Sequence, residues 1–152
     1  MKRSERLSVV EKLIAKQEQQ MAQALGIARQ QLAGEEKKQA ELEEYLVSYQ
    51  DDLTTKSQQG VSGAQWQNYQ FFIEQLESVI LQQKRSVYRS QEQVKMVTQK
   101  WQQINIKKKS MSGLIDNIRM DELVEQEKKD QKVIDDLVTQ MMSQKNRHDS
   151  AE

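Results

Sequence analysis

Side chains that could do acid, base or nucleophilic chemistry are few in this sequence. His148 is the single histidine, it lies in the polar stretch SQKNRHDSAE, and the chain has no cysteine. A nucleophilic site needs a base held beside the nucleophile, and an isolated histidine in a polar tail does not provide one. Asp135 and Asp136 are adjacent on a predicted helix, where neighbouring side chains diverge by about 100 degrees and cannot share a site.

Sequence motifs for phosphate, metal and nucleotide binding are also absent. We find no glycine-rich phosphate loop, no cluster with metal-ligand spacing and no dinucleotide fingerprint. The run KKK at 107–109 leaves binding of an anion open, but Lys108 falls on a predicted apolar seam, from which its long stem can extend to solvent. We therefore expect no enzymatic activity, no cofactor and no metal.

Composition sets the class of protein. Of the 152 residues, 36% are hydrophobic and 30% are charged, which is poor material for a compact core. The 23 basic and 23 acidic residues cancel, so no long-range field attracts nucleic acid. No run approaches the roughly 18 apolar residues of a membrane span, and the start MKRSERLSVVEK lacks the apolar core of a signal peptide. We expect a cytoplasmic protein that inserts into no membrane.

Helix is favoured along almost the whole chain, because it has no proline and only five glycines. Low hydrophobicity also marks disordered chains, but these do not keep an apolar period. Residues 66–118 keep steps of three and four, which predicts a seam facing another helix in a coiled coil. This seam comprises Trp66, Tyr69, Ile73, Leu76, Ile80, Gln83, Val87, Ser90, Val94, Val97, Trp101, Ile104, Lys108, Met111, Ile115 and Ile118.

A looser seam precedes it in the first third of the chain, with Leu7, Ile14, Met21, Ala28, Glu35, Leu42 and Tyr49 at one position and Leu25, Leu32, Leu46 and Leu53 at the other. Between the two seams lies TTKSQQGVSGAQ, where Gly60 and Gly63 offer the freedom for a reversal and Ser62 can cap the second helix. We predict an all-α fold, a long antiparallel two-helix coiled coil in one elongated domain. Helix one spans about 4–57, the turn about 58–63, helix two about 64–145 and a disordered tail about 146–152.

Folding about residue 61 pairs Leu7 with Ile115, Met21 with Trp101, Leu42 with Ile80, and Tyr49 with Ile73. In this pairing the N-terminal end of helix one lies opposite Ile118, and the apolar pattern of helix two also ends there. Trp101 is expected in the core over Ala28 or Met21. Beyond that point a new apolar stripe follows, with Met120, Leu123, Ile134, Leu137 and Met141. A protruding amphipathic helix without an internal partner predicts an external partner or an oligomer.

Aromatic residues are concentrated near the turn, since six of the eight lie between Tyr45 and Phe72. Trp66 and Tyr69 are on the seam and can plug its end. Phe71 and Phe72 are off the seam, and a two-helix structure cannot easily bury both. Together with the row Leu42, Tyr45 and Tyr49 on helix one, Phe72 predicts a protein-docking ridge. The alternative is a short third helix or kink near residues 60–70 that covers these rings.

These features resemble the FliJ family of bacterial flagellar export proteins. The resemblance is carried by LEEYLVSYQDDL before the turn, by WQNYQFFIEQLESVILQQ after it, and by the ending EKKDQKVIDDLVTQMM. It spans essentially the whole chain, although the beginning MKRSERLSVVEKLIAKQEQQ is generic for coiled coils. The resemblance implies a fold similar to the central stalk of rotary ATPases.

The same resemblance implies the partners. In this family the paired helix ends enter the hexameric ring of the export ATPase FliI and promote its assembly, and the other part of the hairpin contacts the export gate protein FlhA. FliH and the cycling of export chaperones are also implied, at the cytoplasmic side of the inner membrane. Mapped onto this chain, the ATPase-facing residues are Leu7, Val10, Ile14, Ile134, Leu137 and Met141, and the gate-facing residues are Leu42, Tyr45, Tyr49, Phe72, Leu76, Val79 and Gln83.

Two alternatives stay open at this point. The corresponding stalk protein of a virulence-type secretion system shares the architecture but not usually the aromatic run. A generic structural or chaperone-like coiled coil would clamp client proteins or self-associate, and it needs none of the named partners.

Overall fold

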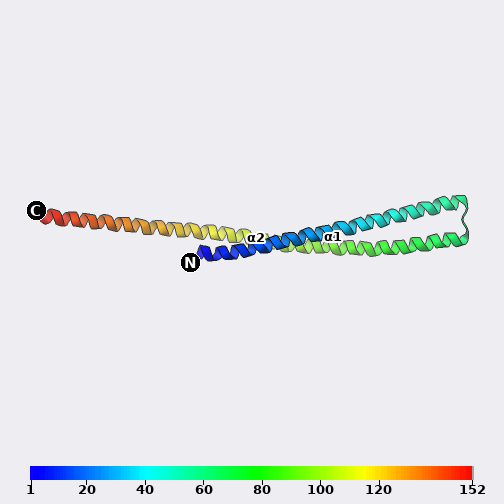
Figure 1. Ribbon diagram of the computed structural model, residues 1–152, viewed down its shortest axis with the longest axis horizontal. Helices are drawn as coiled ribbons and strands as arrows, with labels where there is room; N and C mark the ends of the chain where they lie inside the picture. Colours follow the sequence, from blue (N-terminus) through cyan, green and yellow to red (C-terminus); the bar gives the residue numbers. More distant parts are fainter. Residues whose placement is uncertain (152) are drawn as a thin grey trace. The chain divides into compact units, whose positions relative to one another are not determined.

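The computed structural model describes residues 1–151 and consists of two long helices packed against each other (Figure 1). Helix α1 is Arg3–Gln59 and helix α2 is Gly63–Ala151. No strand occurs in these residues. The predicted all-α helical hairpin is confirmed, and its cause is a sequence of helix formers without an interior proline. Of the tail expected to be disordered, residues 146–151 are helical, and residue 152 lies outside the described residues.

The turn between the helices depends on one glycine and one serine. Gly60 has a φ of 96°, a left-handed conformation that a side chain would disfavour. The Ser62 hydroxyl accepts a hydrogen bond from the backbone N–H of Gln65 at 3.2 Å, so Ser62 caps α2 as predicted. Gly63 is the first residue of α2 and has no positive φ, so the reversal does not use its freedom.

Chain contacts divide the protein into two compact units, and both helices contribute to each. The first unit joins Met1–Lys16 to Ile106 and the residues after it, and the second unit is Gln17–Asn105. Each unit is therefore a segment of α1 packed on a segment of α2, and each has a core of its own.

The core of the second unit follows the predicted seam. Its buried side chains are Leu25, Ala28, Leu53, Ile73, Ile80, Val87 and Val97. Polar contacts interrupt this seam at two places, Gln83 and Trp101. The Gln83 amide donates to the backbone carbonyl of Glu35 at 2.9 Å and also bonds the Glu35 carboxylate. Since both side chains are half-buried and bonded, the polar layer leaves no unpaired group in the seam.

Two aromatic residues on this seam differ from the prediction. Trp101 is half-buried, but its indole Nε1–H donates to Glu18 at 3.2 Å, so the ring is anchored at a polar edge as well as packed. Trp66 is exposed, and the expectation that it plugs the end of the seam is wrong. Ser57 and Val61 lie near it at the turn and are too small to cover an indole ring.

In the first unit the core is a short apolar row that comprises Ile14, Ile115 and Ile118, with Ile115 only 1% exposed. All three were predicted as seam positions, and their burial confirms that they lie on the seam. The pairing differs from the prediction, because Ser4 bonds Glu122, four residues beyond the predicted Ile118. These isoleucine side chains form the interface between the two helices, so a cavity left by truncating one of them destabilises their pairing.

We predict that Ile115→Ala lowers the free energy of unfolding by about 2 to 3 kcal/mol, because it leaves a cavity between the helices. The matched control is Ile106→Ala in the same helix, since Ile106 is 65% exposed. Its effect is expected to stay below about 1 kcal/mol. Urea unfolding followed by circular dichroism measures both, and equal losses for the two variants would contradict the assigned seam.

Candidate functional site

The aromatic ridge, defined as Leu42, Tyr45, Tyr49, Phe72, Leu76, Val79 and Gln83, lies within the second unit. Its two helices meet at Tyr49 and Phe72, whose ring centroids are 4.4 Å apart with a 44° angle between the ring planes. The predicted partner of Tyr49 was Ile73, one residue further along α2. The structure therefore brings the predicted rows from α1 and α2 together.

Exposure divides the ridge into a base and a crest. Leu42, Tyr49 and Leu76 are half-buried against the partner helix, and Gln83 is half-buried and bonded to Glu35. Tyr45, Phe72 and Val79 are exposed, with Phe72 retaining 44% of its surface. A crest of large apolar side chains on a packed base is a surface suited to protein docking, because the base holds the rings in place.

No additional helix covers the neighbouring rings. Helix α2 runs without a break from Gly63, so the alternative of a short third helix or kink near residues 60–70 is excluded. Phe71 is exposed beside Phe72 and makes no ring contact within residues 1–151. Tyr69, one turn from the ridge, is instead bonded through its hydroxyl to Lys56, which also lies 4.9 Å from its ring centroid.

A second exposed surface is the C-terminal overhang, defined as residues 123–151 of α2 in the first unit. Every residue of this segment is exposed. Figure 1 shows this end of α2, coloured from yellow to red, continuing past the N-terminus of α1. The predicted ATPase-facing residues Ile134, Leu137 and Met141 lie here, together with exposed Val133, Val138 and Met142. An amphipathic helix whose apolar face has no cover is a candidate binding element.

The predicted N-terminal members of the same set are not equally accessible. Val10 is exposed, Leu7 is half-buried, and Ile14 is 3% exposed. Ile14 therefore contributes to the core that holds α1 on α2, and the accessible apolar surface near this end of α1 comprises Val9, Val10 and Leu13.

A polar contact marks the end of the pairing before the overhang. The backbone N–H of Ser4 donates to Glu122 Oε1 at 3.2 Å, and the Ser4 hydroxyl donates to Glu122 Oε2 at 2.7 Å. Glu122 thus caps the N-terminus of α1 from the facing helix, where a carboxylate also complements the helix dipole. The Ser4 hydroxyl hydrogen bond lowers the pKa of Glu122 below its ordinary value of 4.5, and burial opposes this shift.

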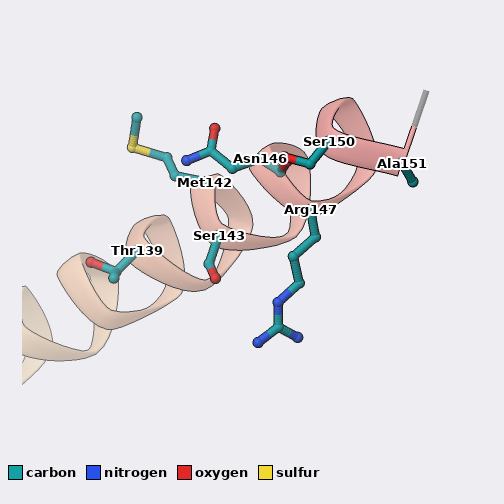
Figure 2. A pocket seen from close by; sticks show the side chains of 7 residues that line it. All are labelled: Thr139, Met142, Ser143, Asn146, Arg147, Ser150 and Ala151. Carbon is teal, nitrogen blue, oxygen red and sulfur yellow. The ribbon is translucent and has the colours of Figure 1, made fainter.

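One surface hollow lies on the overhang and is not an enclosed site. It is lined by Thr139, Met142, Ser143, Asn146, Arg147, Ser150 and Ala151, all from one helix. Figure 2 shows Met142 and Arg147 projecting in opposite directions from the helix, so no walls face one another. Such a surface cannot surround a small molecule.

Residues with catalytic or metal-binding chemistry are not brought together in residues 1–151. No group of three or more His, Cys, Asp or Glu side chains lies close enough to hold a metal ion. His148 is exposed, and Asp135 accepts a hydrogen bond from the Gln131 amide at 3.1 Å on the outer face of the helix. Neither described helix contains a segment long and apolar enough to cross a membrane.

Comparison with known proteins shows the family of this helical chain. A family profile described as the flagellar FliJ protein matches residues 2–147. The chain belongs to the FliJ family. No curated protein and no solved structure matches it. Membership in the FliJ family implies a role connected with flagellar export.

Two exposed residues of this FliJ-family chain were missed by the sequence reasoning. Leu81 and Tyr88 are off the predicted seam, and both are more than half exposed. The sequence feature that could have identified them is a pair of large apolar residues off the seam, next to Lys84, Arg85 and Arg89.

We predict that Glu122→Gln lowers the thermal midpoint at about pH 7, because a neutral amide is a weaker acceptor for Ser4. Since folding lowers the pKa of Glu122, its stabilisation is complete above the ordinary value of 4.5 and is lost as the pH falls through the lower, folded-state pKa. The difference from wild type should therefore shrink in acid. Glu125→Gln, at an exposed position, is the control. A difference that persists unchanged below the folded-state pKa would rule out the carboxylate as its cause.

Proposed function

We propose that this chain is a component of the bacterial flagellar type III export apparatus that couples the export ATPase FliI to the export gate protein FlhA. The observation that carries the proposal is the presence of two separate exposed apolar surfaces, one in each unit, on a chain of the FliJ family. One binding surface would suit a simple adaptor, whereas two suit a coupling protein. The site of action is the cytoplasmic side of the inner membrane.

The C-terminal overhang is the proposed ATPase-binding element. Its apolar residues Ile134, Leu137 and Met141 are spaced by three and four, so they lie on one face of α2. Nothing within residues 1–151 covers that face. A single bare helix is narrow enough to enter the opening of a ring, since a helix with its side chains is about 10 to 12 Å wide. Val10, supported by Leu7 and Ile14, extends the proposed surface onto α1.

The aromatic ridge is the proposed gate-binding element. Aromatic side chains bury a large area at little entropic cost, and they dominate the energetics of many interfaces. Phe72 is the residue we expect to contribute most, because it is partly exposed and its ring is held against Tyr49.

A self-associating coiled coil is the second candidate function, and the uncovered overhang is the observation that favours it. In that case the apolar face would be covered by a second copy. A concentration-dependent dimer in sizing experiments, together with no effect on the ATPase, would support this candidate.

We predict that the chain stimulates ATP turnover by purified FliI and that Ile134→Glu with Leu137→Glu abolishes the stimulation. Charges on the apolar face prevent its burial. The control pair is Thr139→Glu with Ser143→Glu, because Ser143 is nine residues from Ile134 and lies about half a turn away on the helix. Deletion of residues 119–152 should also abolish stimulation. If the unaltered chain neither stimulates nor binds FliI, the ATPase role is wrong.

We predict that Phe72→Ala weakens binding to the cytoplasmic part of FlhA by about tenfold or more, as expected for a central aromatic anchor. Helix content by circular dichroism should stay unchanged. Phe71→Ala is the matched control, because it removes an equally large exposed ring from the adjacent position. Binding titrations measured by calorimetry compare the three chains. A parallel loss of helix in Phe72→Ala would make the residue structural instead.

A further inference from the structure

A second aromatic surface lies on α2 within the second unit, apart from the ridge. The Tyr88 patch, defined as Leu81, Lys84, Arg85, Tyr88 and Arg89, surrounds a shallow hollow with an apolar floor. Leu81 is 53% exposed and Tyr88 is 62% exposed. The two are seven residues apart, so they lie on one face of the helix about two turns apart.

The position of this patch separates it from the aromatic ridge. Leu81 is nine residues beyond Phe72, which places it about half a turn around the helix axis. A partner that covers Phe72 therefore does not cover Leu81 or Tyr88. The patch goes beyond the proposed function, since neither proposed docking surface includes any of its residues.

The patch is basic along α2, in a chain with no net charge, while the nearby Glu35 carboxylate of α1 is bonded to Gln83. Lys84, Arg85 and Arg89 lie within six positions, and no Asp or Glu occurs between Glu77 and Glu92. None of the three cations forms an ion pair with a carboxylate within residues 1–151. Their positive charge is therefore available to a partner.

The Tyr88 ring is also available. Within the described residues, the contact between two rings is that of Tyr49 with Phe72, and the contact of a cation with a ring is that of Lys56 with Tyr69. Neither face of the Tyr88 ring is taken by such a contact. An exposed tyrosine between arginines combines the residue types that contribute most to protein interfaces.

We propose that the Tyr88 patch binds an acidic helical segment of a partner protein, with one large apolar side chain seated between Leu81 and Tyr88. Carboxylates of that segment pair with Lys84, Arg85 and Arg89, and the guanidinium groups can bind carboxylates through two parallel hydrogen bonds. Charge complementarity selects this occupant. The patch covers about two helical turns and the chain has no net charge, which suits one short acidic segment better than a lipid surface or a nucleic acid.

A designed probe tests the proposal with the full chain. The probe is a fluorescent helical peptide with Glu on both flanks of a single Phe and with Ala and Gln elsewhere. Fluorescence anisotropy should show saturable binding that weakens at higher salt, because the ion pairs are exposed. Replacing Glu by Gln in the peptide, or Phe by Ala, should weaken binding.

The matched variants localise the binding. Lys84→Gln with Arg85→Gln and Arg89→Gln should weaken it by about tenfold or more, and Tyr88→Ala should weaken it as well. The control is Lys100→Gln with Lys107→Gln and Lys109→Gln, which removes the same charge from exposed positions elsewhere on α2 and should leave binding intact. Circular dichroism should show unchanged helix in every variant.

Several outcomes would overturn the proposal. Equal binding by the patch variant and the control would mean that general positive charge attracts the peptide. Equal binding of the Gln peptide would remove the role of carboxylates. Binding to vesicles of phosphatidylserine and phosphatidylcholine in place of the peptide would assign the patch to a lipid surface, and a dimer lost in the patch variant would assign it to a second copy. Because no FliI or FlhA is present, failure here leaves the proposed function untouched.

Discussion

The apolar seam between α1 and α2 is the constraint on which the remaining features depend. A pair of helices can bury one stripe on each partner, and in this chain that stripe is filled by residues such as Ile73, Ile80 and Ile115. Any other large apolar side chain stays in contact with water. Exposed Phe72, Tyr88 and Leu137 are therefore a geometric consequence of the two-helix fold, and their grouping at particular places is what indicates binding surfaces.

Polar contacts fix how the two helices are aligned. Within the second unit, Gln83 bonds Glu35 and Trp101 bonds Glu18, and within the first unit Glu122 bonds Ser4. Sliding one helix by a turn would break these bonds and leave half-buried polar groups without partners, which is costly. Apolar side chains alone tolerate such sliding, because one isoleucine can replace another in the seam. The few polar positions therefore determine which residues of α1 and α2 face each other.

The fold could be predicted from the sequence because a period of three and four over many turns has a single physical meaning. The burial of Ile115 and Ile118 and the cap at Ser62 follow from local patterns of this kind. Trp66 was assigned wrongly, because periodicity does not reveal that Ser57 and Val61 are too small to cover an indole ring. Ile14 was predicted both as a seam residue and as a surface residue of the candidate site, and it is buried. The sequence alone does not distinguish these two positions for an apolar side chain. The Tyr88 patch was not predicted, because the apolar period identifies the buried seam and carries no information about the outer face of the helix.

The unequal lengths of α1, with 57 residues, and α2, with 89 residues, leave the overhang without tertiary support. Its backbone hydrogen bonds are maintained by intrinsic propensity alone, and helices held in this way are marginal in water. Ends of this kind fray on the submicrosecond timescale of helix and coil exchange. A partner that binds residues 123–151 must therefore order the segment as it binds, and part of the binding free energy is spent on that ordering.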